Sequence, residues 1–184
     1  MRHKKDEDII NFSNAQRVFS FLVEDPRKEF LASEIQKAAG LSKAGVYRAL
    51  DELVRRELVK KQERGRFVLY SAVADDCVVR QFKVLKTVVS LKKLVQKLKA
   101  FSRKIVLFGS AARGEDYKDS DLDLLIVAKD PEAAQKAVSN FKPGRKIQPV
   151  IKTSVQLSQM ETSSQEFLNE INSGIVLWEE TDES

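Results

Sequence analysis

Apolar residues recur with helical spacing through the first part of the chain. In residues 14–23 and 31–39 they return every three or four positions, which predicts two amphipathic helices. Residues 43–57 show the same period and predict a third. Gly40 suits the left-handed position after a helix, and Ser42 suits the N-cap of the next one. The pattern therefore predicts a helix-turn-helix, two helices joined by a short turn that contains glycine.

The period changes to that of a β-hairpin directly after the third helix. Residues 58–73 form two runs rich in β-branched and aromatic side chains, with a turn at residues 63–66 and Gly65 at its tip. With this hairpin as a wing, residues 13–73 resemble the winged helix-turn-helix domain of prokaryotic transcriptional regulators, which implies double-stranded DNA as a partner. A three-helix packing module without DNA contact is the alternative. The candidate DNA contacts are Ser42, Lys43, Ala44, Tyr47, Arg48, Arg64 and Arg66.

One long helix is predicted over residues 76–100, because this stretch contains neither proline nor glycine. Its apolar positions follow a heptad-like seam: Val84, Val88, Leu91, Val95 and Leu98. The seam could pack on the domain that follows, or it could pair two copies of the chain. We favour the homodimer, which would present two recognition helices with two-fold symmetry to a palindromic site.

Two short apolar strands follow, and the residues next to them carry the candidate chemistry. Residues 105–108 read as a strand, and Gly109-Ser110 then forms a turn whose N–H groups and hydroxyl can approach phosphate oxygens. Asp121 opens the next strand. Because side chains alternate along a strand, Asp121 and Asp123 share one face, where two carboxylates suit Mg²⁺ bound together with substrate phosphates.

These motifs carry a second resemblance. Gly109-Ser110, Arg113-Gly114 and the run Ser120 to Leu124 look like the signature of the DNA polymerase β-like nucleotidyltransferases, in particular the minimal ones, over about residues 100–178. The resemblance implies a nucleoside triphosphate held by Gly109 and Ser110, with Arg113 as a weaker candidate, and Mg²⁺ bound by Asp121 and Asp123. It also implies a helical partner protein. The alternative is an aspartate-rich surface turn between two ordinary strands.

The third acidic residue of this family is missing from its expected place. The neighbouring strand should run from Lys146 to Lys152, and the matching position holds Gln148. A carboxamide takes no proton at neutral pH and is a far weaker Mg²⁺ ligand than a carboxylate. Loss of a positioned general base typically costs about 10²–10⁴ in rate. Pro149 cannot donate to a sheet ladder, so this strand should lie at an edge or a bulge.

Composition and charge complete the expected organisation. We expect an α+β chain with a winged helix-turn-helix domain (1–75), a linker or dimerisation helix (76–100) and a small mixed α/β nucleotidyltransferase-like domain (101–184). Residues 1–100 carry 22 lysine and arginine residues against 13 acidic ones, and residues 101–184 carry 10 against 14. This asymmetry favours a nucleic-acid partner for the first half. No long apolar run or signal peptide is evident, so a cytoplasmic protein without membrane contact is expected, with Cys77 buried or partly buried.

Two functions from different classes follow from these features. The one we prefer is a DNA-binding transcriptional regulator whose nucleotidyltransferase-like domain binds nucleotide and Mg²⁺ but is catalytically weak or inactive because of Gln148. The alternative is an active Mg²⁺-dependent nucleotidyltransferase. Such an enzyme would move a nucleoside monophosphate from a triphosphate to a hydroxyl on protein, nucleic acid or a small molecule.

Overall fold

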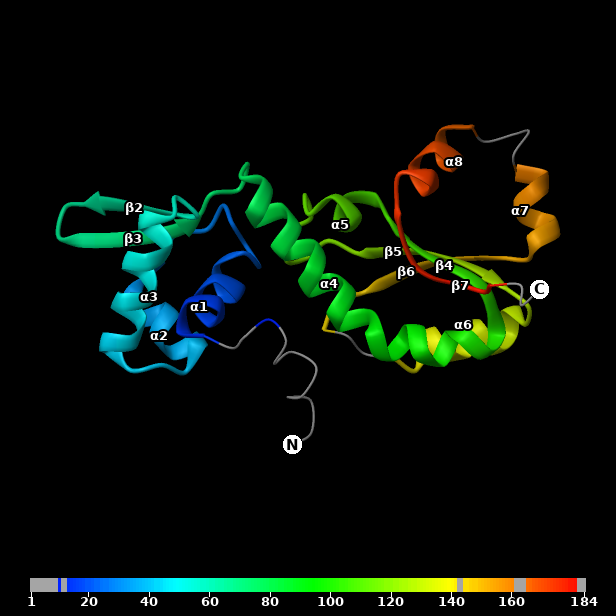
Figure 1. Ribbon diagram of the computed structural model, residues 1–184, viewed down its shortest axis with the longest axis horizontal. Coiled ribbons are helices and arrows are strands. Elements are labelled where there is room, and N and C mark those ends of the chain that lie inside the picture. Colours follow the sequence, from blue (N-terminus) through cyan, green and yellow to red (C-terminus); the bar gives the residue numbers. More distant parts are fainter. Residues whose placement is uncertain (1–9, 11–12, 142–143, 161–164, 182–184) are drawn as a thin grey trace. The chain divides into compact units, whose positions relative to one another are not determined.

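Residues 10, 13–141, 144–160 and 165–181 are described by the structure, a computed structural model of the 184-residue chain. The chain divides into two units, residues 1–86 and 87–184. The first unit contains α1 (Asn14–Leu22), β1 (Phe30–Leu31), α2 (Ala32–Ala39), α3 (Lys43–Arg55), β2 (Val59–Arg64) and β3 (Phe67–Ala72) (Figure 1). This order of elements is the winged helix-turn-helix that the sequence predicted.

Local sequence signals explain the boundaries of α2 and α3. Gly40 ends α2 in the left-handed conformation, with φ of 61°. Ser42 caps α3, because its Oγ accepts a hydrogen bond from the Gly45 N–H at 3.2 Å. The apolar faces of α1, α2 and α3 then meet around Leu22, Ile35 and Leu50, which are fully buried. The turn between α2 and α3 is therefore fixed by the chain's own capping chemistry.

The wing is a β-hairpin in a three-stranded antiparallel sheet of order β1-β3-β2. Arg64 pairs with Phe67 across the turn, and Gly65 occupies the tip with φ of 59°. Of the six residues in β2, only Val59 is buried, whereas Tyr70 and Ala72 of β3 reach the core. The hairpin is thus anchored at its base and exposed at its tip.

Helix α4 (Cys77–Leu98) fills the stretch predicted as one long helix. Within the first unit, Phe82 packs against the core at a ring-centroid distance of 4.8 Å from Phe19. Within the second unit, Leu91 and Leu98 are fully buried in the core of that unit. Most of the heptad-like seam is therefore covered by the chain itself, which removes the reason for expecting a homodimer through it. Cys77, the first residue of the helix, is exposed rather than buried or partly buried as expected.

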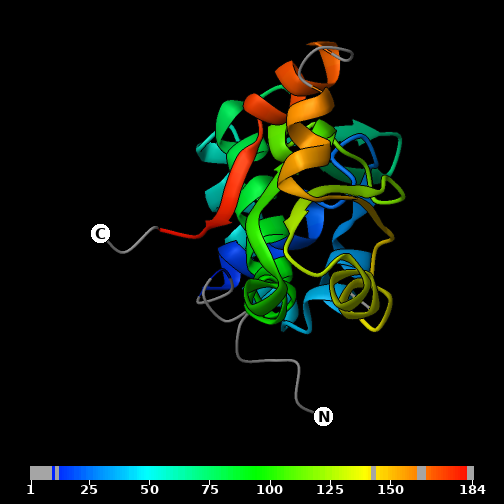
Figure 2. The same cartoon turned by 90° about the vertical axis from the view of Figure 1, so that its right-hand side faces the viewer.

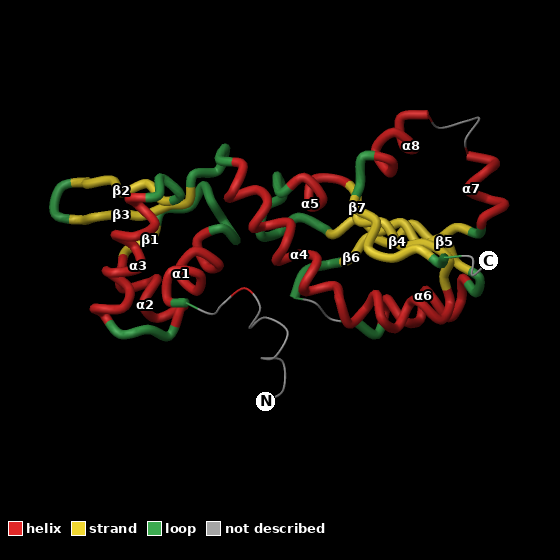
Figure 3. Tube along the Cα trace, in the orientation of Figure 1, coloured by secondary structure: helices red, strands yellow, loops and turns green. Residues whose placement is uncertain are grey.

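A four-stranded sheet of order β6-β5-β4-β7 forms the centre of the second unit. Strand β4 pairs antiparallel with β5 and β7, and β5 pairs parallel with β6. Figure 3 distinguishes the strands from the helices of this unit. Its elements after α4 are a 3-10 turn (Lys99–Phe101), β4 (Ser102–Phe108), α5 (Gly109–Arg113), β5 (Leu122–Ala128), α6 (Pro131–Ser139), β6 (Ile147–Lys152), α7 (Ser154–Met160), α8 (Gln165–Asn172) and β7 (Ile175–Glu179).

Both faces of this sheet are covered, because β5 carries apolar residues that point to each face in turn. Leu122 and Leu124 face a core shared with α6 and the end of α4. Leu125 and Val127 face a smaller core with Phe167 and Ile171 of α8. Helices α7 and α8 accordingly lie on the side of the sheet opposite α6 (Figure 2). Asp123, which alternates with Leu122 and Leu124, belongs to the α7–α8 side, and Asp121 immediately precedes the strand.

The edge position of β6 was correctly predicted from Pro149, since β6 is the outermost strand beside β5. Helix α7 was not predicted. Ser163 and Ser164, the two serines that could cap α8, lie outside the described part of the chain. Among the described residues, no helix combines the length and the apolar composition needed to cross a membrane.

Candidate functional site

The turn after β4 is built so that a carboxylate can touch its backbone. Gly109 has φ of 71°, in the left-handed region that disfavours residues with a side chain. A Cβ at this position would lie 2.5 Å from Oδ2 of Asp123. Glycine is therefore favoured by the backbone conformation, and a side chain here would also force the Asp123 carboxylate to shift. Ser110 follows at once and lies at the same end of the sheet.

The two predicted acidic residues lie beside this turn. Asp123 pairs in register with Phe108 of β4, and Asp121 immediately precedes β5. Burial raises the pKa of Asp123 above its ordinary value of 3.8, and the negative charges of Glu170 and then Asp121 add to the rise. The two aspartates thus interact electrostatically, and Glu170 of α8 is a third acidic residue in their neighbourhood that sequence reasoning missed.

Gln148 occupies the position expected for the missing carboxylate. Strand β6 pairs with β5 so that Gln148 stands opposite Asp123 in the parallel register. Its side chain is exposed. The place of Gln148 is therefore as predicted, and the acidic pair faces an uncharged amide on the neighbouring strand.

A lysine, rather than an acid, is the second neighbour on that strand. Nζ of Lys146 donates a hydrogen bond to Oδ2 of Asp121 at 2.9 Å. The Lys146 side chain is 75% exposed and that of Asp121 30%. This pair also went unpredicted, because the two residues are 25 positions apart and meet only through the pairing of β5 with β6.

Arg113, expected near the nucleotide, makes ion pairs with acidic side chains. Its Nε donates to Glu115 at 2.9 Å, and its Nη1 lies 3.8 Å from Glu170. Both partners are about half exposed, as is Arg113 itself. The guanidinium is therefore placed between Glu115 and Glu170, where it offsets part of the negative charge around Asp123.

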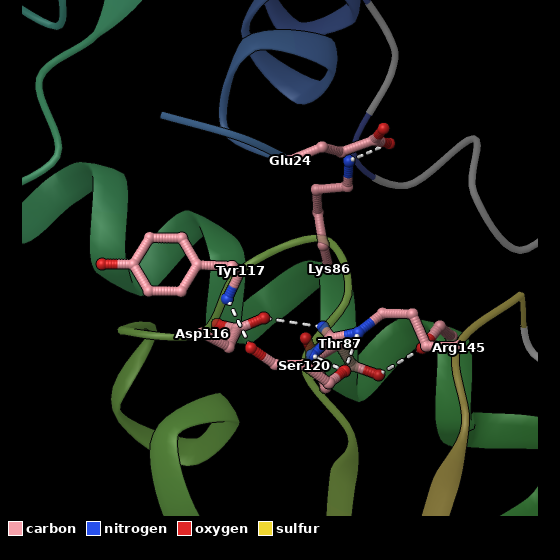
Figure 4. A network of polar contacts seen from close by, with 8 residues as sticks. Glu24, Lys86, Thr87, Asp116, Tyr117, Ser120 and Arg145 are labelled. Atoms are coloured by element: carbon pink, nitrogen blue, oxygen red, sulfur yellow. Dashed lines mark hydrogen bonds and ion pairs between the residues drawn. The ribbon is translucent and has the colours of Figure 1, made fainter. Parts of the chain in front are cut away.

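The loop between α5 and β5 is held by a network that the sequence did not reveal (Figure 4). Arg145 donates to the Ser120 carbonyl oxygen from Nε at 3.0 Å and from Nη2 at 2.8 Å. Its Nη1 donates to Oδ2 of Asp116 at 2.6 Å, and Asp116 is only 4% exposed. Oγ of Ser120 in turn accepts from the Tyr117 N–H at 2.8 Å. Arg145 thus anchors the loop at the residue before Asp121.

The donor set of this site does not fit the resident Mg²⁺ ions that the resemblance implied. Mg²⁺ prefers carboxylate and phosphate oxygens in near-octahedral geometry. Here Asp121 is already paired with Lys146, and Gln148 replaces the third acid. Within the described residues, no group of three or more acidic, histidine or cysteine side chains is arranged to hold a metal ion.

The candidate DNA surface lies on α3 and the wing. All five predicted contacts at the start of α3 are exposed, and Tyr47 retains 43% of its surface. Beside them is a groove of about 480 Å³ lined by Tyr47, Asp51 and Phe67 among others. Burial raises the pKa of Tyr70, which also lines this groove, and nearby Tyr47 adds to the rise, so the phenol stays neutral. The residues that line the groove come from α3 and the wing, together with the start of α2.

The two wing arginines differ in their surroundings. Arg64 forms an ion pair with Glu29 at 2.9 Å, which ties the wing to the loop before β1. Arg66 lies over the Phe67 ring at 5.1 Å and stays exposed at the tip. Of the two, Arg66 is the better placed to reach a phosphate, because Arg64 would have to leave a carboxylate to do so.

Two parts of the chain match different family models. Residues 90–183 match the family model described as polymerase beta, nucleotidyltransferase. Residues 11–75 match the model described as sugar-specific transcriptional regulator TrmB. No match was found among curated protein sequences.

Two solved structures show a partial likeness. ZitR of Lactococcus lactis, solved as a mutant in complex with DNA, is 20% identical over 46% of this chain and 60% of its own, with a TM-score of 0.38. A possible transcriptional regulator from Methanosarcina mazei Go1 is 12% identical over 54% of this chain and 88% of its own, with a TM-score of 0.34.

Proposed function

Because the chain belongs to the polymerase beta nucleotidyltransferase family and carries a TrmB-like winged-helix domain ahead of that region, we propose that it is a DNA-binding transcriptional regulator. Its nucleotidyltransferase domain binds a nucleoside triphosphate and does not transfer it efficiently. The observation that carries the proposal is Gln148 paired opposite Asp123, and the left-handed turn at Gly109, directly before Ser110, supports it.

DNA binding is supported by the exposed start of α3. Lys43, Ala44, Tyr47 and Arg48 project from the first turns of a helix whose opposite face is buried. In a helix-turn-helix, the N-terminal residues of the second helix contact base edges in the major groove. Arg66 at the wing tip supplies a further positive charge for the phosphate backbone.

The DNA contact is tested with Arg48→Ala and a matched change, Arg55→Ala, at the other end of α3. We expect Arg48→Ala to weaken binding of the full chain to a fluorescent random-sequence duplex. Each lost phosphate contact should also reduce the slope of log affinity against log salt by about 0.9. Arg55→Ala should bind like the unchanged protein. Binding that is absent or independent of salt would refute the proposal.

Nucleotide binding is the second part of the proposal. The Gly109 turn and the Ser110 hydroxyl would receive the phosphates, and calorimetry with ATP, GTP, CTP and UTP in turn tests whether they do. Ser110→Ala should weaken the interaction, because it removes one hydrogen-bond donor from the turn. If none of the four triphosphates binds, this domain does not serve as a nucleotide site.

Transfer chemistry is not part of the proposal. A general base beside Asp123 would be needed to take the proton of the attacking hydroxyl. The amide of Gln148 cannot do this at neutral pH. Dimerisation is also left out, since a dimer on a palindromic site would need a surface other than the buried seam of α4.

A further inference from the structure

A lysine of the chain itself lies beside the acidic pair. Lys146 directly precedes β6, and its carbonyl oxygen accepts a hydrogen bond from the Leu122 N–H at 2.9 Å. Its backbone is thus fastened to β5 between Asp121 and Asp123. The preceding residue, Arg145, is fixed by its bonds to Asp116 and Ser120. The backbone of Lys146 is therefore placed so that its Nζ can reach Asp121, and its side chain is largely exposed.

The charges at this sheet edge differ from those of a metal site. Asp121 and Asp123 carry two negative charges at this edge, and a carboxylate at position 148 would add a third on the paired strands. The charge of nearby Glu170 is offset by its ion pair with Arg113. Here Gln148 contributes none and Lys146 contributes one positive charge. The attraction for a divalent cation is correspondingly weaker, because like charges repel at this range.

An ammonium group can perform the bridging task of a metal ion toward phosphate. It is a compact cation with three N–H donors. One donor of Lys146 is used by Asp121, and the exposure of the side chain leaves the others open to a ligand. Phosphate oxygens are strong acceptors for such charge-assisted hydrogen bonds. The same lysine can thus contact Asp121 and a phosphate at once.

We propose that Lys146 takes the place of the divalent metal ion in this site. It links Asp121 to a phosphate group of the bound triphosphate, so nucleotide binding does not require Mg²⁺. The inference rests on the proposed function, since it concerns how the same site holds its nucleotide. It departs from the metal dependence that the family resemblance implied.

The first test measures ATP binding to the full chain by calorimetry, in Mg²⁺ and in EDTA. The unchanged protein should bind with affinities that agree within about threefold, or roughly 0.7 kcal/mol. Lys146→Ala should lose about tenfold in EDTA. The matched control is Lys104→Ala, which breaks a similar exposed pair, Lys104 to Glu179 at 3.0 Å, and should have no effect. ATP binding that requires Mg²⁺ in the unchanged protein, or survives Lys146→Ala in EDTA, would overturn the proposal.

A second test needs no nucleotide. Mn²⁺ binding followed by electron paramagnetic resonance should be weakest in the unchanged protein, tighter in Lys146→Ala, and tightest in Lys146→Ala combined with Gln148→Asp. If ATP fails to bind while this order holds, nucleotide binding by the domain is refuted, and Lys146 remains the cation of the acidic pair. If Lys146→Ala leaves Mn²⁺ binding unchanged, the role of Lys146 is refuted, whatever the nucleotide does.

Discussion

Replacing Arg145 with alanine should destabilise the second unit by about 3 kcal/mol. The change removes two hydrogen bonds to the Ser120 carbonyl oxygen and one to the Asp116 carboxylate. Removing one partner of a buried ion pair typically costs about 3–5 kcal/mol. The lower end applies here, because the Arg145 side chain is 23% exposed and water can replace part of what is lost.

The assay is urea unfolding followed by the fluorescence of Trp178. This is the single tryptophan of the chain, and it lies on β7 in the second unit. The signal therefore reports that unit alone, which avoids assuming that both units unfold in one step. The free energy of unfolding is obtained by linear extrapolation, and an unchanged slope would show that the change acts on the folded state.

The control is again Lys104→Ala, which breaks a more exposed ion pair in the same unit. Its partners are 35% and 54% exposed, so the expected cost is about 0–1 kcal/mol. A cycle that combines Arg145→Ala with Asp116→Asn should give a coupling energy of about 0.5–3 kcal/mol. If Arg145→Ala cost no more than Lys104→Ala, the loop would not depend on this arginine, and the reasoning would be refuted.

Three further changes address the site itself. Gly109→Ala should lower the melting temperature of the second unit by more than Gly65→Ala lowers that of the first. Both glycines have positive φ, but only at Gly109 would the added Cβ meet another residue, Asp123, at 2.5 Å. Equal losses of melting temperature would contradict this close approach. Asp123→Asn should stabilise the protein at pH 7, because the raised pKa of Asp123 means that folding disfavours its carboxylate. The gain should shrink as the pH falls through the raised pKa toward the ordinary 3.8 and should be absent below that value, and urea unfolding at several pH values that shows no gain at pH 7 would contradict the pKa shift. Gln148→Asp made in the Lys146→Ala background should increase Mg²⁺-dependent transfer of labelled nucleotide by about 10²–10⁴ over Lys146→Ala alone, and no increase would mean that Gln148 is not what limits transfer.

Local signals in the sequence were sufficient to predict the helix-turn-helix. Gly40 and Ser42 act through their immediate neighbours, so their effect on α2 and α3 could be predicted without knowing the fold. The same holds for the alternation that places Asp123 on the face opposite Leu122 and Leu124. Pro149 lacks an N–H whatever surrounds it, and this property alone predicted an edge strand.

Contacts between distant segments could not be predicted in this way. Arg145 and Asp116 are 29 positions apart in the sequence, and Lys146 and Asp121 are 25 apart. No repeating pattern of residues indicates that either pair is in contact. Glu170 approaches Asp123 only because α8 covers that side of the sheet. The heptad-like seam of α4 was read as an interface, since a sequence does not reveal which core will cover an apolar stripe.

Helix α4 also indicates how the protein can be taken apart. The boundary between the units falls after Lys86, and the apolar residues on each side of it pack into different cores. Val79 and Phe82 pack into the core of the first unit, and Leu91 and Leu94 pack into the core of the second. A protease site engineered between Lys86 and Thr87 would leave every one of these four side chains attached to its own core. Cleavage a turn or two later would expose Leu91 or strip it from its partners. The middle of an unbroken helix, rather than a loop, is thus the place to separate the two halves for independent study.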